Sequence, residues 1–187
     1  KADEFKKFPN ILCEANHKMK LHIFNIDRES IEILIEPLTK SFEVDLSYTS
    51  ITKEWIQLSC KNKKHGEINH FISSAKKLFF AKAIDSKNIF KYIINKLQQN
   101  ERTITFAESC TGGLIASKFT AQSGASSVLK GSSVTYSNDI KHEWLGVDKE
   151  VFENFGAVSK ECVDQMCIGA LQIAKADFSI AVSGIAG

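Results

Sequence analysis

Two kinds of hydrophobic pattern divide the chain. Up to about residue 85, segments that alternate between apolar and polar positions follow one another closely, as in an antiparallel sheet. From residue 86 onward, short apolar segments alternate with stretches whose apolar residues recur every three to four positions, as strands separated by helices do. The patterns predict an α+β module at 20–85, followed by a layered α/β domain with a largely parallel sheet at 86–187.

The first module is predicted in the order β-α-β-β-α. Asp27 can cap the first helix, whose face carries Ile31, Leu34, Ile35 and Leu38, and Pro37 would kink or end it late. The basic segment Lys61-Asn62-Lys63-Lys64 is interpreted as a solvated loop in preference to an RNA-binding one, and no G-x-x-G loop accompanies it. The elements are strand Lys20–Ile26, helix Asp27–Lys40, strands Phe42–Thr49 and Trp55–Ser59, and helix His65–Ala83.

The second domain is predicted to alternate helices and strands. Ser86 is the expected cap of its first helix, and Gly112-Gly113 forms the turn between its first strand and second helix. The elements are helices Lys87–Gln99, Leu114–Ala121, Asp139–Leu145, Lys149–Phe155 and Lys160–Ala174, and strands Thr103–Ala107, Gly131–Tyr136 and Phe178–Val182.

Composition and charge argue against several classes of function. The 187 residues include 24 basic and 22 acidic ones, a net charge of +2 that gives no global argument for a nucleic acid or a membrane surface. No apolar run approaches the roughly 20 residues of a membrane span. The five cysteines include no C-x-x-C pair and the histidines are scattered, so we expect reduced thiols in a cytoplasmic protein, with no metal site and no cofactor.

The strongest candidate for chemistry is the turn after strand Thr103–Ala107. A strand that ends in a glycine-rich turn before a helix points backbone N–H groups at one place, which suits a phosphate or an oxyanion, and Ser109 lies there. Two alternatives stay open at this point. Ser109 or Thr111 could only cap the following helix, and Cys110 could be either a nucleophile or a small buried hydrophobe.

A second hydroxyl-rich segment, Ser132–Asn138, also follows a predicted strand. Carboxyl ends of parallel strands share one edge of a sheet, so this segment and the Ser109 turn can meet there. Lys141 lies one helical turn further along. A lysine with a lowered pKa, or a tyrosine held by a lysine, could take the proton of Ser109; the alternative is that Tyr136 and Lys141 are ordinary surface residues.

Three further small-residue turns could line the same crevice. Gly124-Ala125-Ser126-Ser127 and Gly156-Ala157-Val158-Ser159 each offer N–H groups and a hydroxyl to a phosphate, or are simply a turn and a cap. Ser183-Gly184-Ile185-Ala186-Gly187 follows the last strand. Because the chain starts at Lys1 without methionine and stops within this turn, we expect it to be a fragment of a longer polypeptide.

Taken in order, 107–113, 134–138 with Lys141, 156–159 and 183–187 resemble the C-terminal nicotinamide-nucleotide amidase domain of the CinA family. The resemblance implies that Ser109 attacks the carboxamide of nicotinamide mononucleotide, a pyridine nucleotide, with Tyr136 and Lys141 assisting proton transfer. The products would be nicotinate mononucleotide and ammonia, in NAD recycling. The resemblance also implies substrate-binding roles for Glu108, Cys110, Thr111, Gly112, Gly113, Ser126, Ser159, Ser183 and Gly184.

The resemblance extends upstream and beyond the end of the chain. It implies that 1–19 is a remnant of, or a linker from, a molybdopterin-binding-like domain, whose activity on ADP-ribose is not assigned to this chain, and that 20–85 is a K-homology-like module. The family pattern continues after Gly187 with two strands, a substrate-contacting arginine and a helix. We therefore expect this chain to hold nucleophile and base but not the whole pocket, and to form a homo-oligomer. The alternatives are a CinA-type scaffold linked to DNA uptake or damage and, less favoured, RNA binding.

Overall fold

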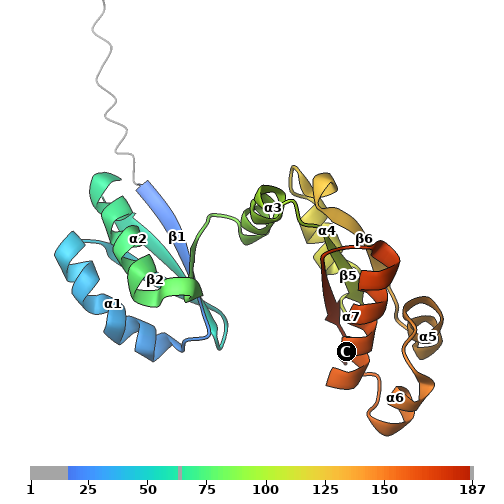
Figure 1. Ribbon diagram of the computed structural model, residues 1–187. Helices are drawn as coiled ribbons and strands as arrows, with labels where there is room; N and C mark the ends of the chain where they lie inside the picture. Colours follow the sequence, from blue (N-terminus) through green and yellow to red (C-terminus); the bar gives the residue numbers. More distant parts are fainter. Residues whose placement is uncertain (1–16, 63–64, 186–187) are drawn as a thin grey trace, which may run out of the picture. The chain divides into compact units, whose positions relative to one another are not determined.

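The computed structural model describes residues 17–62 and 65–185 (Figure 1), and the chain divides into two compact units, Lys1–Lys87 and Asn88–Gly187. The expected domain remnant at 1–19 lies almost entirely outside the described residues. The same holds for Lys63 and Lys64 of the basic segment and for the last two residues of the terminal turn.

The first unit is a four-stranded antiparallel sheet with two helices on one face, as Figure 1 shows. The strand order is β2-β3-β1-β4, and all three pairings are antiparallel. Its elements are β1 (His17–Phe24), α1 (Arg28–Phe42), β2 (Asp45–Thr52), β3 (Trp55–Asn62), α2 (His65–Phe79), the 3-10 turn η1 (Phe80–Lys82) and β4 (Ala83–Asp85).

Alternation along the strands builds the core of this unit. In β3, Ile56, Leu58 and Cys60 are buried, whereas the residues between them are only partly buried. The buried face packs against the helices, which contribute Ile31 and Ile35 from α1 and Ile68, Phe71, Ile72, Ala75 and Phe79 from α2. Asp27 caps α1 as predicted, because its carboxylate accepts the N–H of Ser30 at 2.9 Å.

Helix α1 differs from the prediction in two details. It continues through Pro37 to Phe42, so Phe42 belongs to the helix and not to the next strand. A proline leaves the carbonyl four residues earlier, that of Ile33, without its helical partner; Ile33 is exposed, so water can bond that carbonyl. Leu34 was expected on the buried face but is exposed.

The end of the unit also differs from the prediction. Helix α2 ends at Phe79, and the chain then forms η1 and a short edge strand, β4, that the sequence pattern did not predict. Strand β3 extends to Asn62, whose amide donates to the carbonyls of Phe42 and Glu43, so Lys61 and Asn62 belong to a strand and not to a loop.

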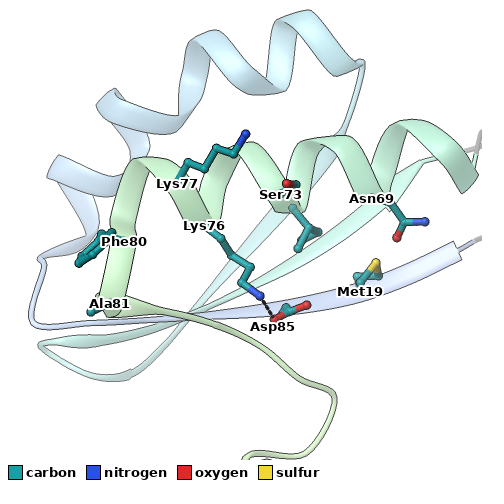
Figure 2. A pocket seen from close by; sticks show the side chains of 9 residues that line it. Met19, Asn69, Ser73, Lys76, Lys77, Phe80, Ala81 and Asp85 are labelled. Atoms are coloured by element: carbon teal, nitrogen blue, oxygen red, sulfur yellow. Dashed lines mark hydrogen bonds and ion pairs between the residues drawn. The ribbon is translucent and has the colours of Figure 1, made fainter.

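A groove of about 600 Å³ lies beside α2 at this edge of the sheet (Figure 2). Lys76 of α2 and Asp85 of β4 form an ion pair of 2.6 Å within it. The groove is lined by Met19, Asn69, Ile72, Ser73, Lys76, Lys77, Phe80, Ala81 and Asp85.

The second unit contains a three-stranded sheet in the order β6-β5-β7, and both pairings are parallel, which confirms the predicted parallel arrangement. Asn88 and not Ser86 caps its first helix, because the Asn88 side chain accepts the N–H of Lys91. The elements are α3 (Ile89–Gln99), β5 (Ile104–Glu108), α4 (Leu114–Thr120), the 3-10 turn η2 (Ala125–Ser127), β6 (Leu129–Val134), α5 (Asn138–Leu145), α6 (Lys149–Asn154), α7 (Lys160–Ala174) and β7 (Phe178–Val182).

Both faces of this sheet are covered. Ile104 and Phe106 of β5 pack into one core with residues of α3 and α4, whereas Ala107 packs into a second core with residues of α5, α6 and α7. All five residues of β5 are therefore buried. Alternate residues of a strand point to opposite faces, so the next residue on the α5–α7 face after Ala107 is Ser109.

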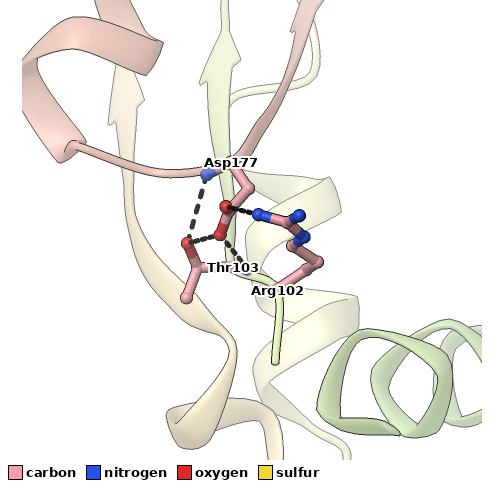
Figure 3. Close-up of polar contacts among 3 residues, drawn as sticks. All are labelled: Arg102, Thr103 and Asp177. Carbon is pink, nitrogen blue, oxygen red and sulfur yellow. Dashed lines mark hydrogen bonds and ion pairs between the residues drawn. The ribbon is translucent and has the colours of Figure 1, made fainter. Parts of the chain in front are cut away.

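A polar cluster ties the amino ends of β5 and β7 together (Figure 3). The Asp177 carboxylate accepts the backbone N–H and the hydroxyl of Thr103, each at 2.8 Å, and pairs with Arg102 at 2.7 Å. These hydrogen bonds and the Arg102 guanidinium lower the pKa of Asp177 to about 2. The cluster holds the amino ends of β5 and β7 together, and Ser109 lies at the opposite, carboxyl end of β5.

Candidate active site

The carboxyl ends of all three parallel strands meet around Ser109, as expected from the sequence. On one side, the N–H of Ser109 donates to the carbonyl of Val182 in β7 at 3.0 Å. On the other, the N–H of Thr135 donates to the carbonyl of Glu108 at 2.8 Å. The Ser109 turn therefore lies between the segments that follow β6 and β7.

The turn itself is closed by backbone hydrogen bonds and two glycines. Gly112 donates its N–H to the carbonyl of Ser109 at 3.0 Å. Gly112 and Gly113 have φ angles of 59° and 96°, a left-handed conformation in which any side chain would be strained. Ser109 is only 5% exposed, and none of the described residues hydrogen-bonds its hydroxyl.

Glu108, and neither Ser109 nor Thr111, satisfies the start of α4. Its fully buried carboxylate accepts the N–H groups of Ile115 and Ala116, at 3.0 and 2.8 Å, and the hydroxyl of Thr111 at 2.7 Å. Burial works to raise the pKa of this carboxyl, but these hydrogen bonds outweigh it and the pKa is lowered. The start of α4, which the sequence predicted as a possible phosphate site, therefore binds the carboxylate of Glu108.

Two backbone donors beside Ser109 remain available. Within the described residues, the N–H groups of Cys110 and Thr111 donate to no protein acceptor. A pair of backbone N–H groups next to a nucleophile is the usual composition of an oxyanion hole. The N–H groups of Cys110 and Thr111 are therefore the candidate oxyanion donors of this turn, since Glu108 occupies the start of α4.

Lys141 is buried in the same unit, with 1% of its surface exposed. It lies on α5, which Ser137 caps by accepting the N–H of Ile140. Its ammonium donates to the carbonyl of Tyr136 at 2.7 Å. Burial lowers the pKa of Lys141, while the thiols of Cys162 and Cys110 act in the opposite direction. Cys110 follows Ser109 directly, so the lysine lies within electrostatic reach of the turn.

Tyr136 differs from the other two predicted catalytic residues. Its side chain is 67% exposed, and no described residue hydrogen-bonds its hydroxyl. Its backbone carbonyl is what orients Lys141. Of the three residues, the structure therefore buries Ser109 and Lys141 in one unit and leaves the tyrosine ring at the surface.

The predicted residues after β7 lie at this edge, and Ser159 has a capping role. Ser183 donates its hydroxyl to the carbonyl of Ala157 at 2.7 Å, which connects two of the predicted turns. A Cβ atom on Gly184 would approach the sulfur of Cys110 to 3.0 Å, so a side chain there would require the thiol to move by a few tenths of an ångström. Ser159 caps α7 by accepting the N–H of Cys162.

Ser126 is not brought to this site. It lies in η2, which leads into the amino end of β6, and the adjoining Val128 accepts the N–H of Ile104 at the start of β5. The amino and carboxyl ends of parallel strands lie at opposite edges of a sheet, so within this chain Ser126 and Ser109 are on opposite edges. The structure therefore does not bring Ser126 together with Ser109 within one chain, and a role of Ser126 in substrate binding stays a prediction.

Two residues near the site were absent from the predicted set. Thr135 is fully buried at the strand end beside Glu108, and its hydroxyl has no partner among the described residues. Cys162 of α7 is buried, and its thiol influences the pKa of Lys141. Thr135 belongs to the hydroxyl-rich segment that contains Tyr136, so the sequence could have indicated it. Nothing in the sequence pattern indicated Cys162.

The part of the chain that the structure describes contains neither a cluster of potential metal ligands nor a membrane-spanning helix. Among these residues there is no group of three or more histidine, cysteine, aspartate or glutamate side chains that could hold a metal ion. None of the described helices is long and apolar enough to cross a membrane.

The sequence of the second unit matches a known protein family. Residues 86–187, more than half of the chain, match the model of the CinA C-terminal domain. The chain belongs to the CinA family. A CinA-like protein of Fervidobacterium nodosum is 55% identical over 105 residues, which cover 56% of this chain and 26% of the relative. A CinA-like protein of Endomicrobium trichonymphae is 36% identical over 185 residues, which cover 89% of this chain and 42% of that protein.

Solved CinA-type structures match the chain over about half its length. The competence/damage inducible protein CihA of Agrobacterium tumefaciens is 45% identical, with a TM-score of 0.52 over 52% of this chain and 59% of that one. A CinA superfamily protein of Escherichia coli is 33% identical, with a TM-score of 0.53 over 54% and 59% of the two chains. The chain thus spans less than two thirds of each of these CinA relatives.

Proposed function

We propose that the second unit of this CinA protein carries an amide hydrolase site with Ser109 as nucleophile. The observation that carries the proposal is the burial, in one unit, of two residues: Ser109, whose hydroxyl is hydrogen-bonded by no described residue, and Lys141, whose pKa is lowered by burial. A lowered pKa makes the neutral amine of a lysine more available, and a neutral lysine amine can take the proton of a serine nucleophile.

The proposed reaction has two steps. Ser109 Oγ attacks the amide carbon while its proton passes to the neutral amine of Lys141, and the N–H groups of Cys110 and Thr111 stabilise the resulting oxyanion. The C–N bond then breaks, the amine proton leaves with ammonia, and an ester on Ser109 remains. Water hydrolyses this ester, which releases the carboxylate and regenerates the serine.

Lys141 suits the role of proton acceptor better than Tyr136 does. The lysine is buried and its Nζ is held by the Tyr136 carbonyl, whereas no described residue hydrogen-bonds the tyrosine hydroxyl. Tyr136 contributes its carbonyl, which holds the lysine, and its exposed ring is suited to contact a substrate from outside. This favours the lysine among the two bases that the sequence left open.

The proposed substrate is nicotinamide mononucleotide, in keeping with the amidase domain that the sequence resembles. Its products are nicotinate mononucleotide and ammonia, and the proposed role is in NAD recycling in the cytoplasm. The residues of the site support amide cleavage as the type of reaction, because amide cleavage requires a nucleophile, a base and oxyanion donors.

The test is ammonia release from nicotinamide mononucleotide by the full-length protein. Ser109→Ala is expected to lower kcat by about a thousandfold or more, because covalent catalysis is lost, while far-UV circular dichroism stays unchanged. Cys110→Ala is the matched control, one residue away, and should retain activity within about tenfold. Turnover by Ser109→Ala within a few fold of the wild type would remove the nucleophile assignment.

A further inference from the structure

The groove beside α2 in the first unit has no part in the proposed amidase site. Its volume of about 600 Å³ lies within the range of roughly 300–1,000 Å³ that is usual for ligand-binding sites. Met19, Ile72 and Ala81 give it an apolar lining, and Figure 2 shows that Lys76, Lys77 and Phe80 stand around it.

Phe80 at the rim combines two costly features. Its ring is 82% exposed, and its φ angle is 50°, in the left-handed region that bulky side chains rarely adopt. The other described non-glycine residues with positive φ are Asn25, Glu43, Glu101 and Lys175, none of them aromatic. A strained backbone that holds an aromatic ring in solvent is a frequent mark of a contact surface.

The groove adjoins an open sheet edge. β4 is the edge strand of its sheet, and no described strand pairs with its outer side. Asp85 of β4 lines the groove, and α2 forms the opposite side. A groove between a helix and an edge strand suits an extended peptide, whose main chain can pair with the strand while alternate side chains enter the groove.

The charge of the groove selects the kind of peptide. The lining contains two lysines and one aspartate, and Asp85 neutralises only Lys76. Lys77 forms no ion pair with a described residue. The surplus positive charge at the rim is complementary to acidic residues on either side of an apolar anchor.

We infer that this groove binds an extended peptide in which apolar side chains are flanked by aspartate or glutamate. The apolar residues occupy the space between Met19, Ile72 and Ala81, and the Phe80 ring covers them. The acidic residues face Lys77. A polypeptide fits better than a nucleic acid, since the groove is mainly apolar and the edge strand offers main-chain pairing.

The test measures fluorescence anisotropy of a labelled Asp-Glu-Leu-Val-Leu-Glu-Asp peptide with the whole chain. A peptide in which lysines replace the acidic residues is the control, and it should bind at least about tenfold more weakly. Phe80→Gly removes the ring and suits the left-handed backbone, so it should weaken binding about tenfold or more without lowering the thermal midpoint. Lys77→Glu should weaken it similarly, and Ile33→Ser, at an exposed apolar position of α1, should not.

Three results would overturn the inference. The first is no binding of the acidic peptide, or equal binding of both peptides. The second is unchanged affinity in Phe80→Gly and Lys77→Glu. The third is tighter binding of single-stranded oligothymidine that the same two variants weaken, which would make the groove a nucleic-acid site. None of these results bears on Ser109, so the amidase proposal is tested separately.

Discussion

Strands β3 and β5 occupy inner positions in their sheets but bury their residues differently. β3 alternates between more and less buried positions, because only one face of its antiparallel sheet is covered by helices. β5 is buried at every position, because helices cover both faces of its parallel sheet. Polar residues therefore have a solvated face available in β3 but not in β5.

This difference explains where chemistry can arise in the molecule. Glu108, the last residue of β5, has a buried carboxylate that requires hydrogen-bond donors, and the first N–H groups of α4 supply them. Ser109 follows it as a buried residue whose hydroxyl is hydrogen-bonded by none of the described residues. In the first unit, the polar groups that could bind a ligand lie at the surface, in the groove beside α2. The reaction site that we propose therefore lies in the second unit, and the peptide groove that we infer lies in the first.

The largest expected effect concerns Lys141. Lys141→Met keeps the length of the side chain but removes the base, so kcat/KM for ammonia release should fall by about 10²–10⁴. Lys118→Met, at an exposed position of α4, is the matched control and should stay near the wild-type rate.

The pH dependence tests the same residue. Only the neutral amine accepts a proton, and the pKa of Lys141 is lowered from the ordinary 10.5, so the wild-type rate should rise with pH until that lowered pKa is passed. Lys141→Met should lose this dependence. A rate that is independent of pH in the wild type, or a rising limb that survives in the variant, would exclude Lys141 as the base.

The next effect compares two carboxylates that both cap helices. Glu108→Ala leaves buried N–H groups without an acceptor and should lower the free energy of unfolding of the second unit by about 3 kcal/mol. Asp27→Ala removes an exposed cap and should destabilise the first unit clearly less. The two tryptophans allow each unit to be followed by fluorescence in urea, Trp55 in the first and Trp144 in the second. Equal losses would contradict the contrast between buried and exposed polar groups.

The smallest effect concerns Asp177. Its pKa in the folded protein is about 2, against an ordinary value of 3.8, so its contribution to stability is complete above pH 3.8 and is lost as pH falls through about 2. Asp177→Asn should therefore reduce the change in the urea midpoint of the second unit between pH 4 and pH 2. Asp45→Asn, in the first unit, should not. A variant with the wild-type pH dependence would show that Asp177 does not stabilise the sheet through its charge.

Much of the second unit could be predicted because its signals are local. Helix Lys160–Ala174 and strand Phe178–Val182 have the predicted bounds, since a serine cap and a clear periodicity mark them. The convergence of strand ends at Ser109 follows from parallel topology. The same topology places Ser126 at the opposite end of the sheet from Ser109, because a turn that precedes a strand lies at the strand's amino end.

Other features were not accessible from the sequence. β4 has three residues, too few to show an alternation. The Glu108 carboxylate bonds N–H groups seven and eight residues later, and no local periodicity indicates such a contact. The burial of Lys141 depends on how α5 packs on α7, which its own helical pattern does not specify. The K-homology-like identity of 20–85 and the substrate-binding roles stay predictions.

The most direct test of the account is to trap the acyl-enzyme. The full-length protein is mixed with nicotinamide mononucleotide, quenched in acid and digested, and the peptides are examined by mass spectrometry. The account predicts a nicotinate mononucleotide ester on Ser109 that is absent from Ser109→Ala. An adduct on Cys110, or steady ammonia release from Ser109→Ala, would contradict it.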